Sequence, residues 1–253
     1  MHAIVLAGQP NHGRLRQVSG AAYEAEILIQ GRRMADFVLD AVEASALVTS
    51  RALVGPEGFE RPGVTRVPIR GGLLDNVLAG LATVPPGATS VLFLTSDIPW
   101  ITGDIIDEFL RLSPRDVDVV YPVIPRAVAE ARFPGTRRTY IRVKDGVFTG
   151  GNLFLVNPAI LPVLAERGQQ LLSHRKSPWK LAQDLGFGFL WRFLTGRLSL
   201  TQIEAEAGSL LGVQGKALIF PYAEAGVDVD KPEDLALAER AVRFSQATGW
   251  GRP

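Results

Sequence analysis

A single carboxylate follows an unbroken run of four apolar residues. Residues 91–94 are four apolar residues without alternation, which indicates a strand buried on both faces. Asp97 comes three residues later, and Pro99 ends the strand because it has no N–H to donate. Open α/β sheets bind their ligands beyond the carboxyl ends of the strands. We therefore interpret Asp97 as functional, because the alternative role of capping the next helix already falls to Thr102.

A second pair of carboxylates, Asp228 and Asp230, lies near the end of the chain. They are two residues apart in an extended segment, so their side chains point the same way. A helix is expected from Pro232, and Asp230 is a natural N-cap for it. Either Asp230 is structural while Asp228 faces the site, or both contribute. Mg²⁺ prefers one or two carboxylates plus nucleotide phosphates, and it relieves the repulsion between the carboxylates. The pattern therefore predicts Mg²⁺ carrying a triphosphate.

Two glycine-containing segments have the composition of nucleotide-binding loops. A polar loop from Gly8 follows the first expected strand, and its backbone N–H groups are suited to phosphate oxygens, with Arg14 and Arg16 adding charge. A plain turn is the alternative. Gly71-Gly72 opens a helix and permits close approach of a ligand. Asn76, one turn in, is suited to hydrogen-bond a base edge or a ribose hydroxyl, and an exposed helical Asn is the alternative.

Composition excludes several classes of function. The chain has 253 residues, with 27 basic and 26 acidic side chains, and this balance gives no footprint for general nucleic-acid binding. It has no Cys, which excludes disulfides and thiolate chemistry. Its longest apolar runs are too short to span a bilayer, and its N-terminus lacks the charged region and cleavage site of a signal peptide. We expect a cytoplasmic protein.

Short strands alternating with helical segments predict a largely parallel, layered α/β sheet. We expect a single domain over residues 1–253, with a helical subregion at about 158–212. Residues 185–200 are hydrophobic nearly all round. Such a segment forms a lid over a bound acceptor molecule, a contact in a homodimer or an element on a membrane surface, or it is buried within the same domain. We favour burial. The tail from residue 245 to 253 is expected to be loose.

A basic segment follows the expected core strands. Residues 124–149 hold six arginines and lysines, which suit an anionic acceptor such as a phosphate. A solvated basic face is the alternative. The sequence Thr149-Gly150-Gly151-Asn152 then leads into another apolar strand, which indicates close backbone approach to a ligand or a bulge.

Taken together, these pieces resemble the MobA-like NTP transferases, the molybdenum-cofactor guanylyltransferase group of the nucleotide-diphospho-sugar transferase (GT-A) superfamily. They span nearly the whole chain in the family's order. The matching segments are Leu6-Ala7-Gly8, Gly31 through Met34 into Val38-Leu39-Asp40-Ala41, Gly71-Gly72 with Asn76, Thr95-Ser96-Asp97-Ile98-Pro99, and Asp228 through Leu235.

The resemblance implies a Rossmann-like GT-A fold with three layers and a mostly parallel, mixed central sheet. It implies an enzyme in which an anionic or hydroxylated small acceptor attacks the α-phosphate of an NTP and pyrophosphate leaves. It implies catalytic roles for Asp97, Arg14 and Asp228, and Mg²⁺ on Asp97 with Asp228 or Asp230. The residues assigned to nucleotide binding are Leu6, Ala7, Gly8, Gln9, Arg16, Gly71, Gly72, Asn76 and Ser96.

Two departures from the family pattern keep other functions open. Gln9 stands where the family has a second glycine, and Glu24 lies in the region where the family has a lysine. Arg14, Arg16, Arg32 or Arg33 is the expected substitute for that lysine. One alternative is a GT-A glycosyltransferase that uses a nucleotide sugar, although such enzymes carry Asp-x-Asp after the central strand. The other alternative is a catalytically silent nucleotide-binding protein.

Overall fold

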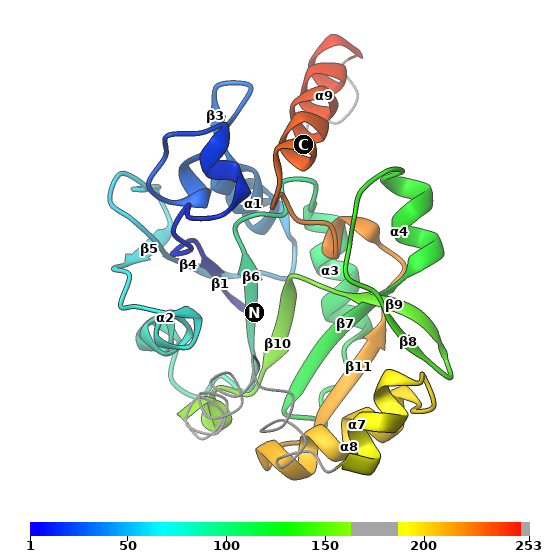
Figure 1. Cartoon of the computed structure of the whole chain (residues 1–253). Helices are drawn as coiled ribbons and strands as arrows, with labels where there is room; N and C mark the ends of the chain where they lie inside the picture. The colour runs from blue at the N-terminus through cyan, green and yellow to red at the C-terminus, as the bar shows by residue number, and fades with distance from the viewer. Residues whose placement is uncertain (163–186, 249–253) are drawn as a thin grey trace.

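The computed structural model describes residues 1–162 and 187–248, and its centre is a β-sheet (Figure 1). The strands of this sheet are β1 (His2–Leu6), β4 (Ser50–Val54), β5 (Val64–Val67), β6 (Val91–Thr95), β7 (Val119–Pro125), β8 (Ile141–Val143), β9 (Gly146–Gly150), β10 (Leu153–Val156) and β11 (Gly215–Ile219). They are ordered β5-β4-β1-β6-β10-β7-β9-β8, with β11 beside β7. A separate ribbon pairs β2 (Leu28–Ile29) with β3 (Arg32–Arg33).

Strand direction decides which loops meet at one edge of the sheet. β1 runs parallel to β4 and β6, and β5 runs parallel to β4. β10 is antiparallel to both β6 and β7, so β7 has the direction of β6, and β11 is parallel to β7. In the centre, Leu6 at the end of β1 is opposite Thr95 at the end of β6. The carboxyl ends of these strands therefore share one edge, where open α/β sheets bind ligands.

Helices cover both faces of the sheet (Figure 1). On one face, α1 (Met34–Ala44) and α3 (Gly103–Leu112) pack in the same buried cluster as Val5. On the other face, α2 (Leu73–Gly80) packs in the cluster that holds Ile4. Successive residues of a strand point to opposite faces, so the apolar run of β1 serves both layers. The fold is the expected Rossmann-like α/β architecture, with a mixed and mostly parallel central sheet between helical layers.

The prediction for the central strand is confirmed. All four residues at 91–94 are 0% exposed, because β6 lies between β1 and β10 and is covered on both faces. The segment Lys144-Asp145-Gly146 forms the turn that joins β8 to β9. A further helix, α4 (Arg126–Arg132), lies inside the basic segment and was not expected from the sequence.

Two predictions for the C-terminal half need correction. The loose tail was expected to begin at residue 245, which is too early. Residues 245–248 are still helical, because α9 extends over Pro232–Thr248. In the subregion 158–212, the structure describes α7 (Phe187–Leu194) and α8 (Leu200–Leu211), and residues 163–186 lie outside the described part. The expected burial of the aromatic stretch is wrong for Trp191 and Leu194, which are 56% and 75% exposed. Of the helices that the structure describes, none combines the length and apolar character needed to cross a bilayer.

Candidate active site

Asp97 lies just beyond the carboxyl end of β6, where backbone hydrogen bonds join three segments. The Ser96 N–H donates to the carbonyl oxygen of Leu6 at 3.1 Å. The Val229 N–H donates to the carbonyl oxygen of Asp97 at 2.8 Å. The ends of β1 and β6 are thus held against the segment that carries Asp228, although the two parts are more than 120 residues apart in sequence.

The side chain of Asp97 is not used to cap a helix. Its carboxylate accepts a hydrogen bond from the hydroxyl of Thr95, at the end of the same strand. The helix cap is Thr102, whose hydroxyl accepts the Ile105 N–H at 3.4 Å at the start of α3. This arrangement agrees with the sequence interpretation and leaves Asp97 facing the edge of the sheet.

Glu24 adds a further carboxylate to the site. From the sequence alone, Glu24 is only a departure from the family pattern. Its backbone N–H donates to the Gln9 carbonyl oxygen at 3.0 Å, so the end of the first loop is tied to it. The side chain is 7% exposed, and its carboxylate has no hydrogen-bond or ion-pair partner among residues 1–162 and 187–248. A buried, unpaired carboxylate is costly, and here it lies beside other acidic groups.

Burial and mutual repulsion raise the pKa of two of these carboxylates. Burial raises the pKa of Asp97 to about 7, and the neighbouring charge of Asp228 acts in the same direction. Burial also raises the pKa of Glu24 to about 7, and Asp97, Asp230 and Asp228 contribute to that rise. These carboxylates lie close enough together for their charges to repel. An arrangement of this kind attracts cations and is typical of functional sites.

Arg138 is a site residue that the sequence analysis noted only as part of the basic segment. Its guanidinium is 5% exposed and forms ion pairs with the carboxylates of Asp228 and Asp234, the second at 3.1 Å. It also donates to the Asp228 carbonyl oxygen at 2.6 Å. The guanidinium of Arg138 therefore fixes both the backbone and the side chain of Asp228. Only the three-dimensional fold reveals this contact, because 90 residues separate the partners.

Asp230 does not have the capping role that its position suggests. The helix begins at Pro232, so Lys231 occupies the N-cap position, and its carbonyl oxygen accepts the N–H groups of Asp234 and Leu235. The backbone N–H of Asp230 instead donates to the Asp234 carboxylate at 3.3 Å. The Asp230 side chain is exposed and lies close enough to raise the pKa values of Asp97 and Glu24.

The arginines of the first loop have different surroundings. Arg16 donates to the carbonyl oxygens of Gly20 and Ala21, both at 3.0 Å, and so closes the loop on itself. Arg14 forms an exposed ion pair with Glu233 at the start of α9, at 3.0 Å. Exposed pairs of this kind contribute little to stability, so Arg14 is available to a phosphate while Arg16 shapes the loop.

Asn76 and Gly8, which the sequence places in separate motifs, are packed against each other. A Cβ atom on Gly8 would lie 2.6 Å from Nδ2 of Asn76, so the close approach requires glycine. The Asn76 carboxamide is 4% exposed, accepts the Arg70 N–H at 2.9 Å and donates to the Gly71 carbonyl oxygen at 3.3 Å. The alternative of an exposed helical Asn is therefore wrong. A direct contact of Asn76 with a base stays a prediction.

The glycine pair at 71–72 has a defined geometry. Gly71 has φ +155°, and a Cβ on it would lie 2.7 Å from Oδ2 of Asp75. The Gly72 N–H donates to the same Asp75 carboxylate at 2.9 Å, which caps α2. The loop is thus held in a shape that leaves both glycines exposed.

Arg32 and Arg33 form ion pairs with carboxylates of α1. The guanidinium of Arg32 pairs with Asp40 and lies over the ring of Phe37 at 4.5 Å. Arg33 pairs with Asp36 at 2.9 Å and also lies over an aromatic ring, 3.8 Å from its centroid. Both guanidiniums are engaged in these contacts, and the replacement of the family's lysine by either arginine stays a prediction.

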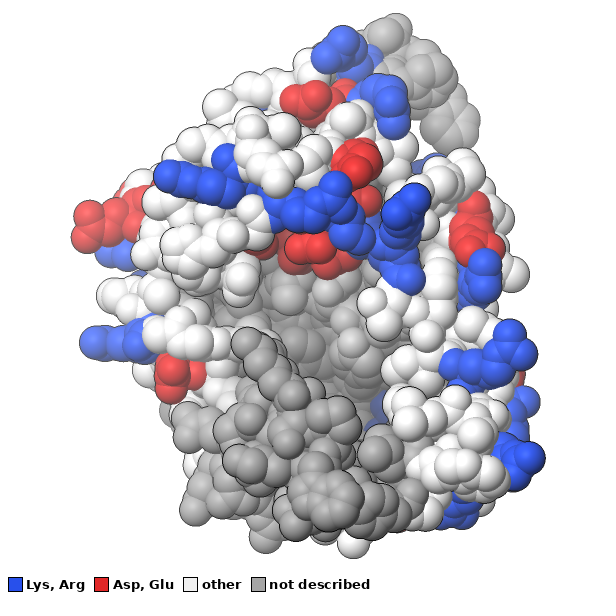
Figure 2. Space-filling view, viewed as in Figure 1, with Lys and Arg blue, Asp and Glu red and all other residues white. Residues whose placement is uncertain are grey.

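Figure 2 shows a hollow in one face of the molecule, with acidic side chains at its upper rim and basic side chains directly above them. Among the described residues, no three His, Asp or Glu side chains form a ready-made metal cluster. Mg²⁺ needs only one or two carboxylates when nucleotide phosphates and water complete its shell, so Asp97 and the free oxygen of Asp228 fit such an ion.

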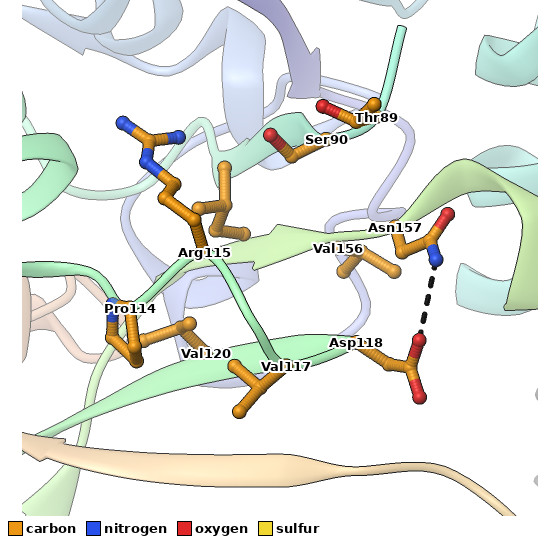
Figure 3. Close-up of a pocket in the computed structure, with 10 residues that line it drawn as sticks. Thr89, Ser90, Pro114, Arg115, Val117, Asp118, Val120, Val156 and Asn157 are labelled. Atoms are coloured by element: carbon orange, nitrogen blue, oxygen red, sulfur yellow. Dashed lines mark hydrogen bonds between the residues drawn. The ribbon is translucent and has the colours of Figure 1, made fainter.

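A second cavity, of about 290 Å³, lies at the opposite edge of the sheet and has a different character (Figure 3). It is lined by residues at the amino ends of β6 and β7. Its charged groups already have partners: Asp118 accepts from Asn157 Nδ2 at 3.2 Å and from the Gln214 N–H at 2.9 Å, and Arg115 donates to the Leu110 carbonyl oxygen. This cavity therefore has no free chemistry comparable to that around Asp97.

Comparison with known proteins agrees with this geometry. A family model described as the MobA-like NTP transferase domain matches residues 3–185. No curated protein sequence matches the chain significantly. Among solved structures, a hypothetical transferase from Thermus thermophilus is 40% identical, with a TM-score of 0.83; the alignment covers 92% of this chain and 98% of that chain.

More distant structures share the fold. The 4-diphosphocytidyl-2C-methyl-D-erythritol synthase of Anaerococcus prevotii is 12% identical with a TM-score of 0.57, over 96% of this chain and 97% of that chain. The 2-C-methyl-D-erythritol 4-phosphate cytidylyltransferase of Thermus thermophilus is 16% identical with a TM-score of 0.54, over 95% and 98%. At these identities the likeness concerns the fold alone.

Proposed function

The chain belongs to the MobA-like NTP transferase family, a group of nucleotidyltransferases, and we propose that it transfers a nucleoside monophosphate from an NTP to a small anionic acceptor, with release of pyrophosphate. The observation that carries this proposal is the pair of neighbouring carboxylates, Asp97 and Asp228, at the carboxyl edge of β6. They lie beside the glycine loop that follows β1. A site that lacks a nucleophilic side chain but concentrates charge suits a reaction that depends on positioning and electrostatics.

Each segment of the edge has a role in this proposal. The backbone from Leu6 to Gln9, together with Ser96, binds the phosphates, and Arg14 supplies positive charge. The exposed Gly71-Gly72 loop, held in shape by the buried Asn76, receives the base. Since Gly8 and Asn76 are in contact, the phosphate loop and the base loop are positioned relative to each other without a ligand.

Mg²⁺ is the cofactor that the donor set favours. Asp97 and Asp228 would hold it. Asp230 lies close enough to Asp97 to raise the pKa of that carboxyl. When bound, the ion would supply positive charge that offsets both the carboxylates and the triphosphate. Arg138 already holds one oxygen of Asp228, so it orients that carboxylate and leaves the other oxygen for the ion.

The reaction exchanges one phosphorus–oxygen bond for another. An oxygen of the acceptor forms a bond to the α-phosphorus, while the bond from that phosphorus to the oxygen bridging to the β-phosphate breaks. The electron pair leaves with pyrophosphate, whose growing charge is met by Arg14 and by Lys231, next to Asp230. Holding both reactants in line is the main contribution of the protein.

Pyrophosphate release tests the proposal. Purified protein is incubated with Mg²⁺, each NTP in turn, and a pool of phosphorylated metabolites. We expect release with one NTP that depends on an acceptor and is lost in Asp97→Asn. The matched control is Asp104→Asn, which removes an exposed carboxylate in the first turn of α3. An Asp97→Asn protein with unchanged turnover contradicts the proposal.

One observation favours a second candidate function. Glu24 places a carboxylate beside Asp97 where the incoming triphosphate is also negative. A protein with this arrangement that binds NTP tightly but releases no pyrophosphate with any acceptor is a nucleotide-binding protein that no longer performs transfer. Tight binding without turnover identifies this case.

A further inference from the structure

A pocket at the start of α9 is distinct both from the carboxylates around Asp97 and from the cavity at the opposite edge of the sheet. Its volume is about 490 Å³, within the range of small-ligand sites. Three segments that are distant in sequence form its walls: the first loop contributes Arg14, residues 134–137 contribute a turn, and residues 231–240 contribute the beginning of α9. The pocket adjoins the site, because Lys231 directly follows Asp230.

The lining of this pocket has an excess of positive charge. Its charged side chains are Arg14, Arg137, Lys231, Arg240, Glu233 and Asp234. Both carboxylates are already paired, since Glu233 binds Arg14 at 3.0 Å and Asp234 binds the buried Arg138 at 3.1 Å. The pocket therefore needs an anion, rather than a further cation, to balance its charge.

Two of the cations are free to bind a ligand. Within residues 1–162 and 187–248, the guanidiniums of Arg137 and Arg240 have no hydrogen-bond or ion-pair partner. Lys231 donates one hydrogen bond, to the Arg137 carbonyl oxygen at 2.9 Å, and retains two donors and its charge. The same bond fixes the turn that carries Arg137 against the start of α9.

The walls are held by buried groups, so the pocket is more than a cluster of surface arginines. Asp234 is 2% exposed, and the Arg138 side chain that it binds is 5% exposed. Arg138 also holds Asp228, so one buried ion-pair network supports both the pocket and the transfer site. The N–H groups of Asp234 and Leu235 are used by the Lys231 carbonyl oxygen, so the side chains, and not the helix N-terminus, bind the ligand.

We propose that this pocket binds a phosphate group of a ligand that reaches the transfer site. Guanidinium groups bind phosphate through paired, charge-assisted hydrogen bonds, and Arg137 and Arg240 provide two such groups from different walls. The role of the pocket in catalysis rests on the proposed function, but its affinity for phosphate does not. The phosphate has one of two sources, the β- and γ-phosphates of the NTP or a phosphate on the acceptor.

Calorimetric titration of the full chain tests this proposal. Arg137→Gln and Arg240→Gln are each compared with Arg111→Gln, which removes the same charge from an exposed position on α3. The probes are inorganic pyrophosphate and inorganic phosphate, the latter with and without saturating NMP. The NTP and the NMP are also titrated separately. We expect each pocket variant to weaken phosphate or pyrophosphate binding about tenfold, as loss of a charge-assisted hydrogen bond predicts, and Arg111→Gln to leave it unchanged.

The source of the phosphate follows from the nucleotide titrations. If NTP binding weakens while NMP binding does not, the pocket receives the β- and γ-phosphates. If neither nucleotide is affected but phosphate binding beside bound NMP weakens, the pocket receives the phosphate of the acceptor. The proposal is overturned if Arg137→Gln and Arg240→Gln bind all four probes with the same affinities as Arg111→Gln. A wild-type protein that binds phosphate through Arg137 and Arg240 but binds no NTP would refute the proposed function and leave the phosphate site standing.

Discussion

Replacing Asp97 with Asn should stabilise the protein while abolishing its activity. Burial and the charge of Asp228 raise the pKa of Asp97 to about 7. The native protein therefore binds more protons than the unfolded chain between about pH 4 and 7, and its stability falls as pH rises through that window. Asn keeps the oxygen that accepts the Thr95 hydrogen bond but carries no charge, so the variant escapes this loss.

The size of the effect follows from the raised pKa. A rise from the ordinary value of 3.8 to about 7 corresponds to a ceiling of about 4 kcal/mol, at ~1.4 kcal/mol for each tenfold change in the dissociation constant. Asp97 is partly open to solvent and titrates together with Asp228, which reduces the expected gain to about 1–2 kcal/mol. In a chain of this length that gain raises the melting temperature by roughly 2–8 °C.

Thermal unfolding in EDTA measures the gain. We expect Asp97→Asn to melt above the wild type at pH 8 and level with it at pH 4, and added Mg²⁺ to narrow the difference at pH 8. Asp107→Asn is the control of opposite sign, because hydrogen bonds from Ser45, Ala46 and Leu47 lower the pKa of the Asp107 carboxyl below its usual range. That variant should melt below the wild type at pH 8. The reasoning is refuted if the difference in melting temperature between Asp97→Asn and the wild type is no larger at pH 8 than at pH 4.

Three other substitutions have defined outcomes. Arg138→Met leaves Asp234 buried and unpaired, so urea denaturation should show a loss of about 3 kcal/mol, and a loss below about 0.5 kcal/mol contradicts the role of the pair. Gly8→Ala brings a Cβ against Asn76 and should cost about 1–3 kcal/mol of stability, less in an Asn76→Ala background; additive costs in the double-mutant cycle argue against the contact. Glu24→Gln removes a negative charge beside the triphosphate and should tighten NTP binding in EDTA about tenfold, by calorimetry, whereas weaker binding would show that Glu24 is a ligand of the nucleotide.

The central sheet was predictable because its signals are local. A run of four apolar residues at 91–94 requires burial on both faces, and the glycines and prolines mark where strands end. The helix α4 was missed because its seven residues, although good helix formers, include a single large apolar side chain and so give no apolar periodicity, and its capping residue is a proline. The exposure of Trp191 and Leu194 was missed because hydrophobicity indicates a tendency to be buried, and the available partner surface decides whether burial occurs.

The site was predictable only in part, because several of its contacts join distant segments. Asp97 could be found from its strand, and Asp228 from its spacing to Asp230. Nothing in the sequence links Arg138 to Asp228, since only the path of the chain after α4 brings them together. The inward placement of Glu24 likewise depends on its backbone bond to Gln9, which closes the first loop.

The central claim is that the NTP is cleaved between its α- and β-phosphates, and positional labelling tests it directly. The reaction is run twice with Mg²⁺ and an acceptor that supports turnover, once with the NTP labelled at the α-phosphate and once at the γ-phosphate. We expect the α-label to move to the acceptor and the γ-label to appear in pyrophosphate. A γ-label on the acceptor, or an α-label that stays in NDP or NMP, contradicts it.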